Sequence, residues 1–259
     1  MTGGGVCARR LVRWLVVSAL AFVSLVCAAD DFENGLESGT IASDAWQLDT
    51  EGACEIDVVA DNKIEGKYAM RFDAAAHGRC EVVPRVYQTW FERYRNEPFG
   101  VERWYEFSTF FPAPWLPNER NEIIAQWHGN ADKFLGDIGS RGPPLAIRIY
   151  GDKFRITSGA DADLISRKAW VARNPLWIGP VVAGQWLKWR AQVRWSYKDD
   201  GLVRIWLNDE QIVDHAGPNT YNDLRGVYLK LGPYHPGLPR IMYLDDVVIG
   251  NKPSENPPR

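Results

Sequence analysis

The stretch 121–128, NEIIAQWH, reads as a β-strand that carries polar groups along one side. Successive side chains of a strand point to opposite faces, so Ile124, Gln126 and His128 are predicted to share one face. The opposite face is predicted to hold Ile123, Ala125 and Trp127. An amide and an imidazole about 7 Å apart on a rigid strand indicate a functional surface that lies next to a hydrophobic core.

A second stretch, YLKLGPY at residues 228–234, repeats this device near the C-terminus. The same alternation predicts that Tyr228, Lys230, Gly232 and Tyr234 share a face. Two strands that each present polar groups at alternate positions can together form the floor of an active site in a β-sheet.

The rest of the chain is patterned in the same way. Residues 186–195, WLKWRAQVRW, alternate most regularly, with Leu187, Trp189, Ala191 and Val193 opposite a basic face. About twelve short strands, separated by turn signals and without a sustained helical period, predict an all-β protein. The predicted architecture is a sandwich of two antiparallel sheets, with the outer face of one sheet as the binding cleft. Residues 159–184 are expected to be irregular, with at most one short helix.

The N-terminal segment has the features of a secretory signal peptide. Arg9, Arg10 and Arg13 precede an apolar run, and Ala28-Ala29 provides small residues for cleavage. Residues 1–29 are therefore predicted to be removed, through the general or the twin-arginine export route. Residues 30–250 are predicted to form one domain, and the proline-rich residues 251–259 a disordered tail. This organisation predicts a secreted or periplasmic protein with no membrane segment after cleavage.

The mature chain is acidic. The whole chain has 30 Lys and Arg against 33 Asp and Glu. Removing three arginines leaves 27, so 27 − 33 gives a net charge of −6. Such a protein is not expected to bind nucleic acid or anionic membranes nonspecifically, although a local basic surface could bind a polyanion. We expect a monomer.

Two cysteines, Cys54 and Cys80, remain after processing. In an oxidising compartment they are predicted to form a disulfide, and two separate buried thiols are the alternative. Without a nearby histidine they do not form a structural zinc site.

Three motifs together resemble a known family. Arg79-x-Glu81, Gln126-Trp127-His128 and the 228–234 stretch are similar to the RxE, QxH and YxKxGxY signatures of jelly-roll polysaccharide lyases. This group includes alginate lyases, glucuronan lyases and the heparin lyase I type. Residues 104–108 and 206–208 also resemble the glucuronan and heparin lyase branch. The resemblance covers most of the mature chain and implies a concanavalin A-like β-jelly roll.

The resemblance implies β-elimination on a β-1,4-linked uronic acid polymer. Gln126 and Arg79 would neutralise the sugar carboxylate, because the C5 proton is otherwise too weakly acidic to be removed. His128 and Tyr234 would supply the base and the acid. If the C5 hydrogen and the C4 oxygen leave from the same side, Tyr234 would serve both steps and His128 would help to neutralise the carboxylate. If they leave from opposite sides, His128 would be the base and Tyr234 the acid.

Other residues are assigned supporting roles. Lys230 would lower the pKa of Tyr234 or hold a substrate carboxylate. Glu81 would orient Arg79, unless the two form only a structural salt bridge. A competing RxE motif occurs at residues 95–97. The remaining substrate-binding candidates lie on polar faces and are Tyr228, Arg148 and Tyr150.

Other classes of function remain open at this stage. A noncatalytic carbohydrate-binding module would have the same fold, and Glu55-Ile56-Asp57 resembles the paired acids of a glycoside hydrolase. No cofactor is required, although Glu33 and Asp246 could bind a structural calcium ion or be ordinary solvated acids. The predicted substrates are glucuronan first and then alginate or a heparin-like chain. Loops 129–144 and 159–184 are expected to set that choice.

Overall fold

The computed structural model describes residues 30–31, 39–64, 67–85, 97–139, 141–168 and 171–254. The predicted signal peptide lies outside these residues. The described residues form fifteen β-strands and one 3₁₀ helix, η3 (Lys133–Leu135). None of their helices is long and apolar enough to cross a membrane.

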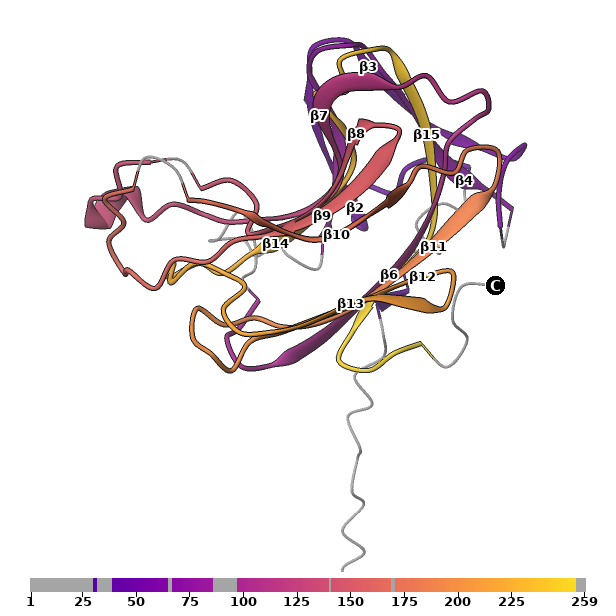
Figure 1. The fold of residues 1–259 in the computed structure, drawn as a ribbon. Coiled ribbons are helices and arrows are strands. Elements are labelled where there is room, and N and C mark those ends of the chain that lie inside the picture. Colours follow the sequence, from indigo (N-terminus) through magenta and orange to yellow (C-terminus); the bar gives the residue numbers. More distant parts are fainter. Residues whose placement is uncertain are drawn as a thin grey trace, which may run out of the picture.

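The strands form two antiparallel sheets packed face to face (Figure 1). The eight-stranded sheet has the order β13 (Glu210–Ala216), β12 (Leu202–Leu207), β11 (Trp186–Arg194), β6 (Glu102–Phe110), β15 (Arg240–Gly250), β4 (Ala69–Ala74) and β3 (Cys54–Val59), and β1 (Asp30–Asp31) also pairs with β15. The seven-stranded sheet has the order β10 (Asn174–Pro180), β9 (Lys153–Ser158), β8 (Leu145–Gly151), β7 (Asn118–His128), β14 (Tyr228–Tyr234), β5 (Arg79–Pro84) and β2 (Trp46–Glu51). This arrangement confirms the predicted β-jelly-roll sandwich.

Large aromatic side chains fill the space between the sheets. The alternation predicted for residues 186–195 is confirmed, because the inward residues of β11 are buried and the outward residues are half-buried. The Trp127 ring of β7 lies 5.1 Å from the Tyr105 ring of β6 and 6.2 Å from the Trp195 ring, between centroids. Burial of these rings provides much of the hydrophobic free energy that holds the layers together.

Three strands, β1, β2 and β10, were not given bounds by the sequence. Strand β10 lies in the stretch expected to be irregular, where Pro175, Gly179 and Pro180 obscure its β-forming residues. The prolines are tolerated because β10 is an edge strand that pairs only with β9. Strand β2 was missed because its polar residues weaken the β signal.

The predicted alternation of 121–128 is wrong at Ile123 and Ile124. In the pairing of β7 with β8, Ile123 lies opposite Arg148 and Ala125 opposite Ile147, so Ile124 is an extra residue. Ile124 and Ala125 both belong to the core. This β-bulge therefore reverses the alternation on its N-terminal side, while Gln126 and Trp127 keep their predicted faces.

The predicted disulfide is confirmed. Cys54 and Cys80 are bonded, with their Cα atoms 5.4 Å apart. Cys54 belongs to β3 and Cys80 to β5, so the bond joins one sheet to the other. Cys80 points into the core and leaves Arg79 and Glu81 on the outer side of β5.

Part of the expected tail, residues 251–254, contacts strand β6. The backbone N–H of Ser254 donates a hydrogen bond to Glu106 at 2.8 Å, and Arg103 donates to Asn251 at 2.5 Å. Residues 251–254 are therefore held against β6, and residues 255–259 lie outside the described part of the chain.

Replacing both cysteines by alanine should reduce the free energy of unfolding by about 3 kcal/mol, because the bond closes a loop of 26 residues. The melting temperature should fall by about 6–12 °C, measured by calorimetry. The reduced wild type should match the double variant. An unchanged melting temperature would show that the cross-link between the sheets contributes nothing.

Candidate active site

One outer surface of the seven-stranded sheet, here called the polar face, gathers the three motifs. It is formed by neighbouring strands β2, β5, β14 and β7. The pairing of β14 with β7 places Lys230 opposite Gln126 and Tyr228 opposite His128. The residues of the polar face are Asp49, Arg79, Glu81, Gln126, His128, Tyr228, Lys230 and Tyr234.

Glu81 lies at the centre of this face and is fully buried. Gln126 Nε2 donates a hydrogen bond to Glu81 Oε1 at 2.5 Å, and Arg79 Nε lies 3.2 Å from Oε2. Lys230 Nζ lies 4.0 Å from the same oxygen. Burial raises the pKa of Glu81 to about 7, even though Lys230, Gln126 and Arg79 favour the charged form.

Asp49 of β2 is a second acid on this face, and the sequence analysis missed it. Both of its carboxylate oxygens accept hydrogen bonds from Arg79 Nη1, at 3.1 and 3.2 Å, and Lys230 Nζ donates at 2.5 Å. Burial opposes ionisation of Asp49, but Lys230 and Arg79 outweigh it and lower its pKa. The alternating acids Asp49 and Glu51 were the available signal, although they lie in a strand that was not predicted.

The NH₂ group of Gln126 faces Glu81. This orientation suits the ionised carboxylate, which only accepts hydrogen bonds. Gln126 Oε1 is then left buried, without a hydrogen-bond partner among the described residues. The second N–H of Gln126 and this oxygen are both suited to contact a polar ligand.

His128 is held as a neutral base. Its Nδ1 atom lies 2.6 Å from the carbonyl oxygen of Gly129. Because a carbonyl only accepts, Nδ1 carries the hydrogen and Nε2 keeps the lone pair. Burial and the positive charges of Lys230 and Arg79 lower the pKa of His128 to about 4, against opposing effects of Gly129 and Asp49.

Tyr234 lies on the same face, but it pairs with a different residue of β7 than Tyr228, the partner of His128. It pairs with Arg79 on one side and Ile123 on the other, and the Arg79 guanidinium is 4.6 Å from its ring centroid. Contacts run from Tyr234 to Arg79, from Arg79 to Glu81 and from Glu81 to Gln126. Gln126 pairs with Lys230, and the next pair on this face is His128 with Tyr228. The structure therefore places the two rings on one surface, with His128 beside Tyr228 at one end of β14 and Tyr234 at the other end.

Gly232 allows this close packing of β14 on β5. Its φ angle is +125°, and a Cβ atom there would approach the Cys80 carbonyl oxygen to 2.2 Å. Glycine alone avoids both the strain and the clash. The resulting close approach brings Tyr234 against Arg79.

The other predicted substrate-binding residues surround the network. Tyr228 lies between His128, at 5.6 Å between ring centroids, and Lys230 Nζ, at 5.5 Å from its ring. Arg148 is on the same side of β8, where its Nε donates to Thr157 Oγ1 at 3.1 Å. The Tyr150 ring packs 4.4 Å from the Arg155 guanidinium.

The competing motifs are placed elsewhere. Glu55 and Asp57 lie on β3 of the eight-stranded sheet, apart from the polar face. Arg95 lies outside the described residues, while the buried Glu97 accepts hydrogen bonds from Arg103 at 2.7 Å and Tyr105 at 3.0 Å.

The calcium prediction remains open. Glu33 lies outside the described residues, and Asp246 lies on β15 with a positive φ angle of 53°. Among the residues that the structure describes, no group of three or more acids, histidines or cysteines is arranged to hold a metal ion.

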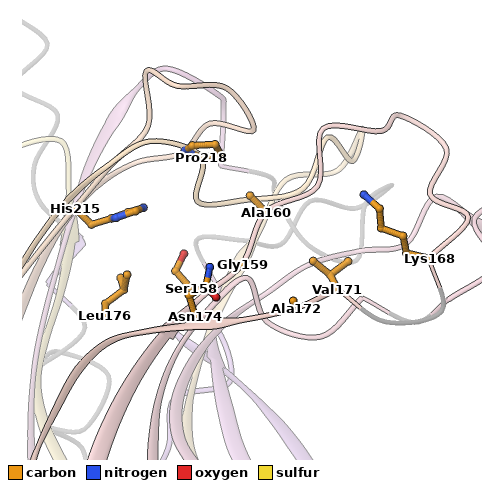
Figure 2. A pocket seen from close by; sticks show the side chains of 10 residues that line it. All are labelled: Ser158, Gly159, Ala160, Lys168, Val171, Ala172, Asn174, Leu176, His215 and Pro218. Carbon is orange, nitrogen blue, oxygen red and sulfur yellow. The ribbon is translucent and has the colours of Figure 1, made fainter.

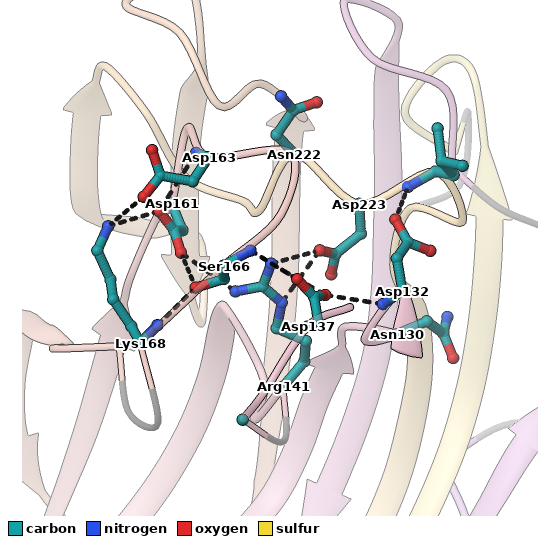
Figure 3. Close-up of polar contacts among 12 residues, drawn as sticks. Asn130, Asp132, Asp137, Arg141, Asp161, Asp163, Ser166, Lys168, Asn222 and Asp223 are labelled. Atoms are coloured by element: carbon teal, nitrogen blue, oxygen red, sulfur yellow. Dashed lines mark hydrogen bonds and ion pairs between the residues drawn. The ribbon is translucent and has the colours of Figure 1, made fainter. Parts of the chain in front are cut away.

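A buried cluster ties together the loops beside the sheet (Figure 3). Arg141 lies at its centre, 2.8 Å from Asp223, 3.2 Å from Asp161 and 3.4 Å from Asp137. Ser166 Oγ donates to Asp161 at 2.6 Å. Residues of three loops, which include the two predicted to set substrate choice, therefore contact the same arginine, and Lys168 Nζ also lies 2.6 Å from Asp161.

A pocket of about 590 Å³ lies near one end of the sandwich (Figure 2). Ser158 and Leu176 from the seven-stranded sheet and His215 from the other sheet line it, together with Lys168. It includes none of the residues of the polar face, so it is not the catalytic site that the motifs indicate.

Replacing Arg141 by methionine should lower the free energy of unfolding by about 3–5 kcal/mol, because the buried Asp137 and Asp223 would lose their arginine and Asp161 would keep only Lys168. Urea denaturation measures this change. Arg204→Met is the matched control, since the exposed pair Arg204–Asp214 should contribute about 0–1 kcal/mol. Equal effects of the two substitutions would contradict a central role for Arg141.

The two-sheet sandwich and its polar face of paired acids, cations, amide, imidazole and phenol define a β-jelly-roll protein with a candidate binding surface. A profile of the polysaccharide lyase family matches residues 36–248. The chain belongs to this family and is a polysaccharide lyase, as the motifs predicted. No curated protein sequence matches it.

Solved structures share the fold. A glucuronan lyase from Trichoderma reesei superposes with a TM-score of 0.67 at 19% identity, over 83% of this chain and 93% of that one. An alginate lyase from Pseudomonas aeruginosa gives a TM-score of 0.51 at 16% identity, over 81% and 99%. A family 131 glycoside hydrolase from Coprinopsis cinerea gives 0.53 at 11% identity, over 89% and 95%. These identities are low, so the structures establish a common architecture and not a common substrate.

Proposed function

We propose that this lyase cleaves a β-1,4-linked uronic acid polymer by β-elimination on the polar face. The observation that carries the proposal is the network of contacts from Tyr234 through Arg79 and Glu81 to Gln126, with His128 two residues further along β7 on the same face. It combines cations, an amide donor and two acid–base groups on one surface, which is what removal of a proton next to a sugar carboxylate requires.

Gln126 and Arg79 neutralise the carboxylate of the reacting sugar in this proposal. The second N–H of Gln126 and the Nη2 group of Arg79 are not used by the contacts to Glu81 and Asp49 described above. Asp49 and Glu81 hold Arg79 from two sides, and Lys230 offsets part of their negative charge. Preorganised donors of this kind stabilise the enediolate that develops as the C5 proton leaves.

In the elimination, a base takes the C5 proton and the C–H electrons form the C4=C5 double bond. The C4–O bond breaks, and the departing oxygen receives a proton from an acid. In β-D-glucuronate both groups leave from the same side, so we assign Tyr234 to both steps. For the opposite C5 configuration, His128 takes the proton and Tyr234 donates one.

The state of His128 changes one expected role. The sequence suggested that His128 helps to neutralise the substrate carboxylate in the first case. Since its Nδ1 hydrogen is bonded to Gly129, the free Nε2 atom can only accept a proton or a hydrogen bond. In both cases His128 therefore acts as an acceptor toward the substrate.

We infer glucuronan as the first substrate and alginate or a heparin-like chain as the next. The similarity in fold to the glucuronan lyase supports this order. We also infer that the enzyme is secreted, which the disulfide supports, and that it acts as a monomer without a cofactor. Tyr228 and Lys230 contact the substrate beside the reacting sugar, and Arg148 and Tyr150 lie further along the sheet.

The test is the rise in ultraviolet absorbance from the new double bond, measured on glucuronan, alginate and heparin. Glucuronan should give the highest kcat/KM. Reducing ends without a rise in absorbance would show hydrolysis and overturn the proposed reaction, and binding without products would indicate a noncatalytic module.

Tyr234→Phe should lower kcat on glucuronan by about 10²–10⁴-fold, because the phenol supplies both proton transfers. Tyr197→Phe is the matched control, since Tyr197 packs against Phe99 at 5.1 Å between ring centroids and is not part of the polar face. A Tyr234→Phe enzyme with wild-type kcat would remove this residue from the mechanism.

The KM for a uronate polymer should increase as the pH rises through about 7, because Glu81 then gains a negative charge beside Arg79 and Lys230. Glu81→Gln should remove this pH dependence, whereas Glu210→Gln, on β13 of the other sheet, should retain it. Steady-state kinetics between pH 5.5 and 8.5 would decide. An identical KM profile in wild type and Glu81→Gln would contradict the assignment.

A further inference from the structure

Two arginines face each other on neighbouring strands beside the proposed catalytic residues. Arg148 of β8 is the direct pairing partner of Arg155 of β9. Like charges directly opposite each other in an antiparallel pair are unfavourable. Such a pair therefore needs a reason other than stability of the sheet.

Arg148 is a buried cation without a counter-charge. It is only 7% exposed, and its Nε hydrogen bonds to the neutral Thr157 hydroxyl. Burial and the nearby positive charge of Arg173 lower the pKa of Arg148 to about 10. Among the described residues, no carboxylate forms an ion pair with Arg148.

Arg155 is in a similar situation. Its guanidinium packs on the Tyr150 ring, and its Nε atom is buried without a hydrogen-bond partner among the described residues. It also forms no ion pair with a carboxylate of those residues. The two guanidinium groups thus have unused hydrogen-bonding capacity and uncompensated positive charge on one surface.

The register places this pair in line with the proposed catalytic residues. One row of paired positions crosses the sheet and runs through Arg79, Tyr234, Ile123, Arg148 and Arg155. Strands lie about 4.8 Å apart, so Arg148 is roughly 10 Å from the Tyr234 position. A pyranose unit is about as long as the strand spacing, so a sugar chain crossing the strands would carry a further sugar over Arg148.

We propose that Arg148 and Arg155 form a second carboxylate-binding subsite, which holds the uronate group of a sugar further along the chain, on the side of the reacting sugar away from Arg79. This inference rests on the proposed function, because the position of the subsite is given relative to the reacting sugar. Planar guanidinium groups match carboxylates with two parallel hydrogen bonds, and Tyr150 holds one of them in place. The bound carboxylate supplies the counter-charge that the protein lacks here.

The subsite predicts an effect that depends on substrate length. Arg148→Met and Arg155→Met should each lower kcat/KM on the uronate polymer by about 10- to 100-fold, because a charged hydrogen-bonded contact is lost. On the shortest oligosaccharide that spans the cleavage site and does not reach Arg148, both variants should lose much less activity than on the polymer. Arg148→Lys should recover part of the polymer activity.

Stability provides an independent readout. Since the arginine pair is repulsive, Arg148→Met and Arg155→Met should keep or raise the melting temperature. A lower melting temperature in both variants, with a uniform loss of activity on long and short substrates, would overturn the proposal in favour of a structural role. Arg204→Met is the control on the other sheet and should change neither measurement.

Equilibrium binding separates this proposal from the proposed function. Binding of intact glucuronan and alginate is measured for the full mature chain and the two variants, without relying on turnover. Binding that weakens in both variants but yields no absorbing product would support the subsite and overturn the elimination. Equal binding by wild type and variants, or no binding of any uronate polymer by wild type, would overturn the subsite.

Discussion

The burial of the Glu81 carboxylate is the constraint on which the rest of the polar face depends. A carboxylate without exposure to water must be surrounded by donors, and Gln126, Arg79 and Lys230 are the groups that surround it. Each of these groups comes from a different strand, so satisfying one acid fixes three side chains relative to one another. The strands are held together by the hydrophobic core, while the positions of the side chains on the polar face are set by their contacts with the Glu81 carboxylate.

The polar face and the loop cluster around Arg141 differ in the ratio of acids to cations. On the polar face, two cations and two acids are interleaved, so the face can remain close to neutral while its donors are held in place. In the loop cluster Arg141 contacts three acids, and Lys168 contacts one of them, Asp161. Burial raises the pKa of Asp223 there to about 7, against the effect of Arg141. The first arrangement prepares a surface for an anion, and the second fastens loops.

The sequence predicted the fold, and it also predicted which side chains share the polar face, because both depend on local patterns. Alternation identified β7, β11 and β14, and it placed Gln126 with His128 on one face of β7 and Lys230 with Tyr234 on one face of β14. The sequence did not reveal the bulge at Ile124, because an extra residue in a strand is defined only by its partner strand. Asp49 was missed for a similar reason: its importance comes from Arg79 and Lys230, which are distant in sequence and adjacent only in the folded sheet.

The close approach of Gly232 to β5 has a consequence for engineering this scaffold. Any side chain there would move β14 away from the Cys80 carbonyl and carry Tyr234 with it, although position 232 itself has no side chain to meet a sugar. A library intended to broaden the range of polymers should therefore vary the connecting loops and leave this glycine unchanged. At Gly232 the close approach of the main chains of β14 and β5 leaves no room for a side chain, so this position tolerates substitution poorly although it carries no reactive group.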